Sequence, residues 1–427
     1  MNSLAEQIHD FGRRARAAAR QLRQCSSEVK NRGLRAMAKR VLAMTEEILE
    51  ANACDLEQAE RDGISGAMLD RLKLDPDRLG KMALGIEQVA ALPDPVGEVM
   101  REWTRPNGLR IGKVRVPIGV IGIIYESRPN VTSDAAVLCT KTGNATILRG
   151  GRESIQSNVA IARALSEGGA EGGLPADAVL LIPVTDREAV RVMCEMDQYL
   201  DCIIPRGGKG LIETVVNHAR MPVIKHYDGI CAVYVDRDAD LGMAEAIVID
   251  AKCQRPGVCN AIETLVLHRD IAGRFLETSG RTLLERGVQL RCDAEALAVA
   301  QAIESEPGQI VAAAPEDFRT EFLDLILAVR VVGSSSEAIE HIESNGSHHS
   351  DGIVTANTST AEDFLSEVDS ATVYWNASTR FTDGGEFGFG AEIGISTDKL
   401  HARGPMGLEE LTTYKYVLRG TGQVRGG

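Results

Sequence analysis

The stretch Ile118-Gly119-Val120-Ile121-Gly122-Ile123-Ile124-Tyr125 is almost continuously apolar. A strand with this pattern has to be covered on both faces, which is typical of a parallel sheet inside an α/β domain. The residues just before it, 109–116, alternate between apolar and polar side chains and predict a strand with one exposed face. The longest apolar run, 116–125, is too short to span a bilayer.

Strand and helix patterns alternate along the chain after this stretch. We expect strands at 145–148, 178–183 and 202–204, each followed by a helix, at 154–167, 187–196 and 210–219. Repeated β-α units predict a doubly wound, mostly parallel sheet. Ligands of such sheets bind at the carboxyl ends of the strands, which correspond here to residues 127–130, 149–151 and 206–210.

The flanking regions predict a helical layer and a second α/β region. Residues 1 to about 92 have helical periodicity, and Asp75-Pro76 is a helix start. In the second region we expect strands at 231–235, 264–267, 326–332, 353–356 and 372–375, and helices at 272–286 and 335–344. The tail contains one extended segment, 412–419, which could pair with 109–116 and form an arm that joins subunits.

The bulk composition argues against several classes of protein. The chain has 427 residues and a net charge of −14, which argues against nucleic-acid binding through a broad basic face. Its nine cysteines include no Cys-x-x-Cys pair, which argues against a zinc knuckle and a disulfide framework. Because the N-terminus also lacks a signal-peptide pattern, we expect a cytoplasmic protein.

Cys259 is the candidate nucleophile, in Ala251-Lys252-Cys253-Gln254-Arg255-Pro256-Gly257-Val258-Cys259-Asn260-Ala261-Ile262-Glu263-Thr264. It follows a Pro-Gly turn signal, and the run after it, 261–267, fits either a helix or a strand. If this run opens as a helix, its amide groups would stabilise a thiolate, and Arg255 would add positive charge. A thiolate attacks acyl carbons near neutral pH. The alternative is a buried structural cysteine.

Several motifs along the chain resemble one enzyme family. They are the nucleophile segment 254–261 and the segments 117–122, 125–130, 141–145, 148–151, 205–208, 376–385 and 401–407. Together these segments resemble the gamma-glutamyl phosphate reductases, also known as glutamate-5-semialdehyde dehydrogenases, a branch of the aldehyde dehydrogenase superfamily. The resemblance spans nearly the whole chain.

The resemblance implies an aldehyde-dehydrogenase-like α/β fold with three segments. Residues 1–228 would form the cofactor-binding domain, with the helical layer and with 109–116 contributing to the arm. Residues 229–376 would form the catalytic domain that carries Cys259. Residues 377–427 would return to the cofactor domain and complete an oligomerisation arm.

The resemblance also implies a reaction. This is the NADPH-dependent reduction of L-glutamate 5-phosphate to L-glutamate 5-semialdehyde plus phosphate, through a thioester on Cys259, in the second step of proline biosynthesis. A homo-oligomer is implied, and the upstream glutamate 5-kinase is a candidate partner. The alternatives are a hydrolytic, NAD-linked aldehyde oxidiser with the same fold and a non-catalytic relative kept for partner binding.

Cofactor residues follow from the resemblance, since no Gly-x-Gly-x-x-Gly fingerprint stands in a strand-turn-helix setting. Arg206-Gly207-Gly208-Lys209-Gly210 would face a phosphate; the alternative is an ordinary loop before a helix. Arg149, beside Gly150 and Gly151 and with Arg152 nearby, would hold the ribose phosphate of NADPH; the alternative is a solvated surface arginine. Glu321 resembles the glutamate that binds the nicotinamide ribose in relatives.

Two departures from hydrolytic relatives bear on the mechanism. Lys225-His226-Tyr227-Asp228-Gly229 stands where those relatives carry a glutamate general base, and the loss of that base is consistent with reduction. Ser127-Arg128-Pro129 replaces the segment with the oxyanion-stabilising asparagine. We therefore expect the Cys259 amide, together with Ser127 or Asn130, to stabilise the oxyanion.

The substrate carries a phosphate and an amino-acid head group. Arg380 is the candidate for binding one of its anions, and Lys225, His226 and Arg255 are further candidates. We expect no metal site, because no other ligand stands at metal-binding spacing from His348-His349.

Overall fold

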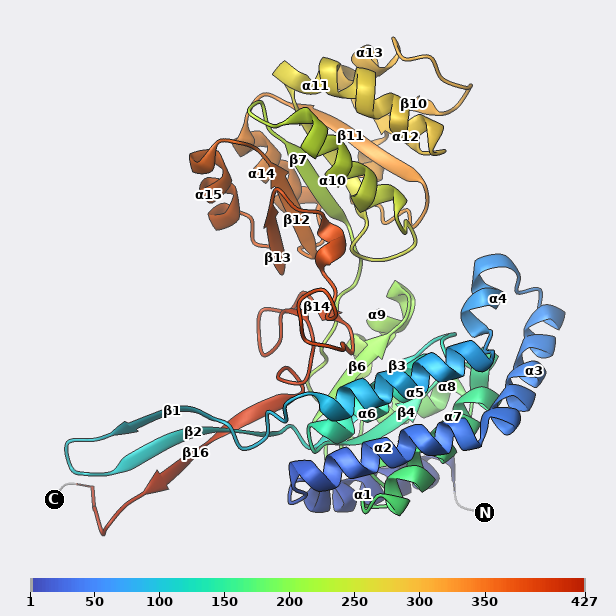
Figure 1. The fold of residues 1–427 in the computed structure, drawn as a ribbon, viewed down its shortest axis with the longest axis vertical. Coiled ribbons are helices and arrows are strands. Elements are labelled where there is room, and N and C mark those ends of the chain that lie inside the picture. The colour runs from blue at the N-terminus through green and yellow to red at the C-terminus, as the bar shows by residue number, and fades with distance from the viewer. Residues whose placement is uncertain (1–2, 426–427) are drawn as a thin grey trace. The chain divides into compact units, whose positions relative to one another are not determined.

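The structure is a computed structural model that describes residues 3–425, and it divides into two compact units (Figure 1). Unit 1 comprises the chain up to Lys225, residues 388–394, and the chain from Met406 onward; unit 2 comprises 226–387 and 395–405. This division differs from the expected one, which ended the first domain at 228 and returned to it at 377. Residues 377–387 stay with unit 2 because Thr379 Oγ1 and Thr382 O hydrogen-bond to Asn260, at 2.7 and 2.9 Å.

A helical layer precedes the first strand, as predicted. It consists of α1 (Leu4–Leu22), α2 (Ser27–Ala43), α3 (Thr45–Arg61), α4 (Gly66–Leu72) and α5 (Pro76–Ala91). The predicted start of α5 is confirmed, since the Asp75 carboxylate accepts a hydrogen bond from the Arg78 amide at 2.8 Å. The apolar face of α2 is buried, and this helix packs against α5 and against α7 (Ile155–Glu171).

Unit 1 contains the predicted doubly wound sheet. Its parallel strands, in the order β5-β4-β3-β6, are β5 (Val179–Leu181), β4 (Ala145–Arg149), β3 (Val120–Tyr125) and β6 (Cys202–Arg206). Its helices are α6 (Asn130–Lys141), α7, α8 (Arg187–Cys194) and α9 (Lys209–His218). Every residue of β3 is buried, which confirms that both faces of this strand are covered. The strand order reverses between β3 and β6, where doubly wound sheets bind ligands.

A three-stranded antiparallel arm belongs to unit 1 (Figure 1). It consists of β1 (Val99–Thr104), β2 (Arg110–Pro117) and β16 (Thr412–Arg419), with β2 in the middle. The register of β16 runs from Thr412 opposite Pro117 to Arg419 opposite Arg110. The predicted pairing between the tail and residues 109–116 is therefore confirmed.

Unit 2 is built around a parallel sheet with the order β10-β9-β11-β8-β7-β12-β13. Its strands are β7 (Cys231–Val235), β8 (Ile262–His268), β9 (Gln289–Cys292), β10 (Ile310–Ala312), β11 (Ile326–Val332), β12 (Ser350–Val354) and β13 (Thr372–Trp375). Its helices are α10 (Leu241–Cys253), α11 (Arg269–Phe275), α12 (Arg281–Glu285), α13 (Ala294–Ala300), α14 (Ser335–Asn345) and α15 (Thr358–Glu367). Two apolar clusters form its core.

The run after Cys259 is the strand β8 and not a helix. Its backbone pairs with β7 and β11, and all of its side chains are buried. The hypothesis that a helix N-terminus stabilises the Cys259 thiolate is therefore wrong, because the loop with Cys259 runs from the end of α10 to the start of β8. The predicted helix 272–286 is interrupted by a π-helical turn, Leu276–Gly280.

Short elements complete the fold: the 3-10 turns η1 (Arg152–Ser154), η3 (Pro315–Arg319) and η4 (Thr379–Phe381), and the antiparallel pair β14 (Ile395–Ser396) and β15 (Gly404–Pro405). Between residues 3 and 425, none of the helices combines the length and the apolar character that crossing a membrane requires.

Candidate active site

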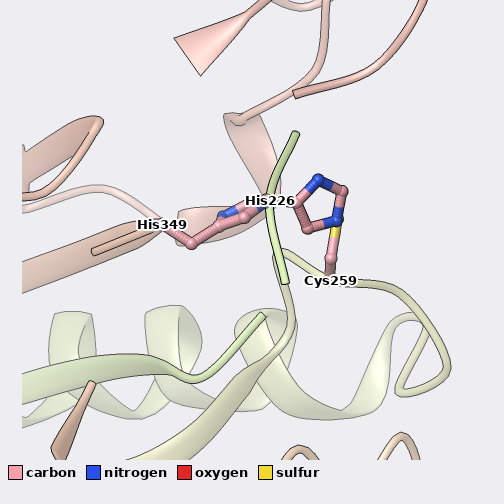
Figure 2. A group of neighbouring side chains, drawn as sticks. All are labelled: His226, Cys259 and His349. Carbon is pink, nitrogen blue, oxygen red and sulfur yellow. The ribbon is translucent and has the colours of Figure 1, made fainter. Parts of the chain in front are cut away.

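Three side chains of unit 2 meet at the amino edge of its sheet (Figure 2). His226 precedes β7, Cys259 precedes β8, and His349 directly precedes β12. Because β8, β7 and β12 are adjacent and parallel, the residues before them lie at one edge. One nitrogen of each histidine and the Cys259 sulfur all lie within 4.8 Å of one another.

His226 is oriented to accept a proton from Cys259. Its Nδ1 lies 3.0 Å from the carbonyl oxygen of Ile395, which can only accept, so Nδ1 carries the hydrogen. In the neutral ring this leaves Nε2 with a lone pair. Figure 2 shows a ring nitrogen of His226 next to the Cys259 sulfur. This is the arrangement of a nucleophile and its base.

His349 is fully buried behind this pair. Its Nδ1 lies 2.9 Å from Ser350 Oγ, whereas its Nε2 has no hydrogen-bond partner among residues 3–425. Burial, and then the nearby His226, lower the pKa of His349 to about 3, so the ring is neutral. The sequence showed no ligand near His349 because its neighbours come from distant segments; the rings of His226 and His349 meet edge to face at 5.5 Å.

The start of β7 holds the backbone of Cys259 from one side. A Cβ at Gly229 would lie 2.2 Å from the Cys259 carbonyl oxygen, so only glycine fits. The Cys231 thiol donates to the same oxygen at 3.2 Å, and burial raises the pKa of Cys231 well above its ordinary value. Glu321, the expected ribose ligand, accepts a hydrogen bond from the Gly229 amide at 2.9 Å. It therefore lies near Cys259, and its role toward a cofactor remains a prediction.

Arg380 lies on the other side of the nucleophile loop. Its guanidinium hydrogen-bonds to the side chain of Asn260 and donates to Gln254 Oε1 at 2.9 Å. Burial lowers the pKa of Arg380, and Cys259 is among the groups that interact with its charge. It lines a cavity of about 270 Å³ together with Asp250, Gln254, Phe381, Asp383 and Glu386.

A buried ion pair joins the two ends of the nucleophile loop. Lys252 Nζ at the end of α10 lies 2.6 Å from Glu263 Oε2 in β8, and both side chains are fully buried. The other oxygen of Glu263 accepts a hydrogen bond from the Leu323 amide at 3.1 Å. Both oxygens of Glu263 therefore have donors, and the pair fixes the loop at its base.

In unit 1 the predicted cofactor loop meets the end of β3. The Gly208 amide, at the start of α9, donates to Glu126 Oε2 at 2.9 Å. A Cβ at Gly207 would lie 2.5 Å from the same carboxylate oxygen. A carboxylate therefore sits where the sequence predicts a phosphate. The sequence assigned no role to Glu126, although negative charge at a helix N-terminus is a recognisable signal.

Arg149 is buried rather than solvated, so the surface-arginine alternative is wrong. Its Nη2 donates to the carbonyls of Thr185 and Asp186 at 2.9 and 3.4 Å, and its Nε has no partner within the described part of the chain. Burial lowers the pKa of Arg149. Beside it, a Cβ at Gly150 would lie 2.1 Å from Asn158 Nδ2. Arg152 is largely exposed, 3.6 Å from Asp62.

The remaining predicted site residues are divided between the units. Ser127 has a φ of +29°, and Asn130 Nδ2 donates to Asp134 Oδ2 at 2.9 Å; both belong to unit 1, whereas Cys259 belongs to unit 2. Their role as oxyanion donors stays a prediction. Lys225 ends the first segment of unit 1, and Arg255 is exposed in the nucleophile loop. Their roles toward the substrate also stay predictions.

Comparison with known proteins places these observations in a family. The profile described as "Aldehyde dehydrogenase family" matches residues 2–294. The gamma-glutamyl phosphate reductase of Heliobacterium modesticaldum is 55% identical over 414 residues, which cover 97% of this chain and 98% of that protein. A crystal structure of the gamma-glutamyl phosphate reductase from Thermotoga maritima has a TM-score of 0.95 and 46% identity, and covers 98% of this chain and 99% of that one.

A more distant structure shares the fold alone. An engineered glycolyl-CoA reductase with bound NADP+ has a TM-score of 0.68 at 14% identity, and 96% of each chain is covered.

Proposed function

Because this chain belongs to the aldehyde dehydrogenase family and matches gamma-glutamyl phosphate reductases over almost its whole length, we infer that it catalyses their reaction. It reduces L-glutamate 5-phosphate to L-glutamate 5-semialdehyde and releases phosphate, the second step of proline biosynthesis from glutamate. The observation that carries this inference is Cys259, in the matching nucleophile segment with His226 beside it.

In the first step, Nε2 of His226 accepts the thiol proton of Cys259. The sulfur then attacks the acyl carbon of the substrate, and a C–S bond forms. The bond from this carbon to the phosphate oxygen breaks, phosphate leaves with the electron pair, and Cys259 carries a thioester. Gly229 and the side chains of Cys231 and Thr379 contact the backbone of the nucleophile loop, hold it in place and reduce the reorganisation that the attack requires.

The second step resolves the thioester. The hydride that reduces it comes from the nicotinamide of a bound dinucleotide. The resulting thiohemiacetal then collapses: its C–S bond breaks, the aldehyde forms, and the electron pair returns to the Cys259 sulfur. His226, protonated in the first step, can return its proton to the sulfur, which restores the Cys259 thiol.

The carboxyl edge of the sheet in unit 1 fits the dinucleotide. Gly207 and Gly208 allow close approach of a phosphate to the backbone at the start of α9. The unpartnered Nε of Arg149 is a buried donor that suits an additional phosphate, and on this ground we propose NADPH as the preferred cofactor.

The amino-acid head of the substrate would bind beside Arg380. The adjoining cavity of about 270 Å³ offers one guanidinium for a carboxylate and the carboxylates of Asp250, Asp383 and Glu386 for an ammonium group. Both charges of the head group then have partners of opposite sign close to the nucleophile loop.

The arm is the surface that we propose joins subunits. Its outer strands β1 and β16 present unpaired backbone edges, and Val99, Tyr414, Tyr416 and Leu418 on them are exposed. Sedimentation of the chain with and without residues 412–427 would test whether the arm is needed for a homo-oligomer.

The reaction is tested in the reverse direction. With glutamate semialdehyde and NADP+, sustained NADPH formation should require inorganic phosphate or arsenate, because the glutamate general base of hydrolytic relatives is absent, whereas phosphate arrives already anionic. Glu263 cannot take that role while Lys252 and Leu323 occupy its oxygens. In chloride at matched ionic strength, turnover should stop after at most about one NADPH per site, the signature of a trapped acyl-enzyme. Sustained turnover without phosphate, with glutamate as product, would instead identify a hydrolytic aldehyde oxidiser.

A further inference from the structure

We propose that His226, Cys259 and His349 form a binding site for a thiophilic divalent cation such as Zn²⁺, and that the bound cation blocks the enzyme reversibly. The blocking rests on the proposed function, because it requires Cys259 to be the nucleophile. The binding itself rests only on the geometry of the three side chains.

The donor set suits Zn²⁺. One cysteine sulfur and two imidazole nitrogens are ligands that this ion prefers, and three protein ligands leave its fourth position open for water or an anion. The three donor atoms lie within 4.8 Å of one another. Tetrahedral zinc with bonds of about 2.0–2.3 Å requires donor atoms roughly 3.3–3.6 Å apart. A contraction of at most about 1.2–1.5 Å, within the reach of side-chain rotation, would complete the site.

His349 provides the independent observation. It is fully buried, and its Nε2 has no hydrogen-bond partner in the described chain, although a buried polar atom ordinarily has one. Figure 2 shows the His349 ring extending toward His226.

The outer nitrogens of both histidines are already oriented. His226 Nδ1 donates to the Ile395 carbonyl, and His349 Nδ1 lies 2.9 Å from Ser350 Oγ. Such contacts fix the tautomer and the direction of a metal-binding histidine. The other nitrogen of each ring is therefore the one that a cation would bind.

Binding of the cation would remove both groups that start the reaction. When the cation binds the Cys259 sulfur, the thiol proton is released to solvent and the electron pair of the thiolate is used in the bond to the metal. The bond between the cation and His226 uses the lone pair that would otherwise accept the thiol proton. Turnover would stop, and a chelator would restore it.

The test compares Zn²⁺ titrations of the wild type, His349→Phe and the control His341→Phe. His341 is also buried with an unpartnered Nε2, and burial lowers its pKa to about 4, but it is not part of the cluster. Wild type and His341→Phe should show chelator-reversible inhibition at the same Zn²⁺ concentration. His349→Phe should keep its turnover and need at least about tenfold more Zn²⁺. His349→Asn, which can keep a polar contact to Ser350, is the second variant if the phenylalanine impairs folding.

Two readouts separate binding from inhibition. Zn²⁺ should protect Cys259 from iodoacetamide, as followed by peptide mass, and Co²⁺ should give a thiolate-to-metal absorption band that His349→Phe weakens. Equal Zn²⁺ sensitivity and equal protection in the wild type and both His349 variants would overturn the three-ligand site. Zn²⁺ protection without loss of turnover would overturn the blocking and the nucleophile role of Cys259, while the metal site would stand.

Discussion

The two parallel sheets of this protein carry their candidate site residues at opposite ends of the strands. Unit 1 places its predicted cofactor residues at the carboxyl ends of β3, β4 and β6, where α9 begins and its N-terminus attracts anions. Unit 2 places Cys259 at the amino end of β8, close to the end of α10. The helix C-terminus at that edge disfavours a thiolate. Under the proposed function, activation of Cys259 would therefore come from a side chain, that of His226.

The two loops also differ in what holds them. The backbone of Cys259 and Asn260 contacts Gly229, Cys231 and Thr379, none of which is a charged group that an anionic ligand would replace. The loop at Gly208 is held by the Glu126 carboxylate, which an anionic ligand would have to replace. Changes at the first loop should therefore lower kcat, whereas changes at the second should act on cofactor affinity.

The largest effect is expected from Cys259→Ala, which removes the nucleophile. We expect kcat to fall by about 10⁴-fold or more, with the fold and NADPH binding retained. Steady-state kinetics and fluorescence titration with NADPH measure the two effects. Cys253→Ala is the control, since Cys253 ends α10 and lies only a few residues away; it should stay active. Activity within about tenfold of wild type, less than ~1.4 kcal/mol of barrier, would exclude Cys259 as the nucleophile.

Gly229→Ala tests how rigidly the nucleophile is placed. The new Cβ would lie 2.2 Å from the Cys259 carbonyl oxygen and 2.5 Å from its Cα, so the loop has to shift. We expect a displacement of about 1 Å, which would lower kcat by about 100-fold with little change in the KM for NADPH. Gly242→Ala is the matched control, because its Cβ would meet nothing closer than 3.4 Å. Wild-type kcat in Gly229→Ala would mean that the loop adapts freely and that the contrast between the loops is false.

Arg149→Ala addresses the cofactor edge. Its unpartnered Nε is the donor offered to the additional phosphate, so binding of NADPH should weaken about tenfold more than binding of NADH, about 1.4 kcal/mol. Arg152→Ala should change neither affinity, since Arg152 is exposed. Equal losses for both cofactors would show that Arg149 supports the loop around Thr185 and does not read the phosphate.

Glu126→Gln should have the smallest effect, and in the opposite direction. This change removes the negative charge that competes with the cofactor phosphate at the N-terminus of α9. The KM for NADPH should therefore fall by about two- to fivefold at low salt. Raising the ionic strength should abolish the difference. A rise in KM would mean that Glu126 is needed to shape the loop.

Local patterns were enough to predict much of the fold. The bounds expected for β7, β11, β13 and β16 agree with the structure, and the Asp75 cap is where the sequence places it. Alternation and helical periodicity of apolar residues indicate which side chains are buried, and this local pattern was enough to predict the bounds of these elements. Residues 261–267 were ambiguous because a fully buried strand lacks alternation; pairing with β7 and β11 decides its form.

The candidate site was harder to predict, because its members come from distant segments. The motif around Cys259 identifies the nucleophile, but nothing in the spacing of His226 and His349 indicates that parallel strands bring them to the same edge. The burial of Arg149 could not be predicted for the same reason, because its guanidinium donates to the carbonyl of Thr185, which follows β5. Sequence patterns therefore indicated the candidate nucleophile, whereas its proximity to His226 and His349 emerged only from the topology.

The pairing of β16 with β2 has a consequence for synthesis on the ribosome. Arg115 in β2 and its partner Glu409, just before β16, are 294 residues apart in the chain. At about 5–20 residues per second, β2 waits roughly 15–60 s before β16 emerges to cover its edge. Throughout that interval β2 is paired with β1 alone and its other edge is uncovered, while all of unit 2 is translated. Unit 1 thus begins the chain but is completed last, and a chaperone that shields β2 would act in this window.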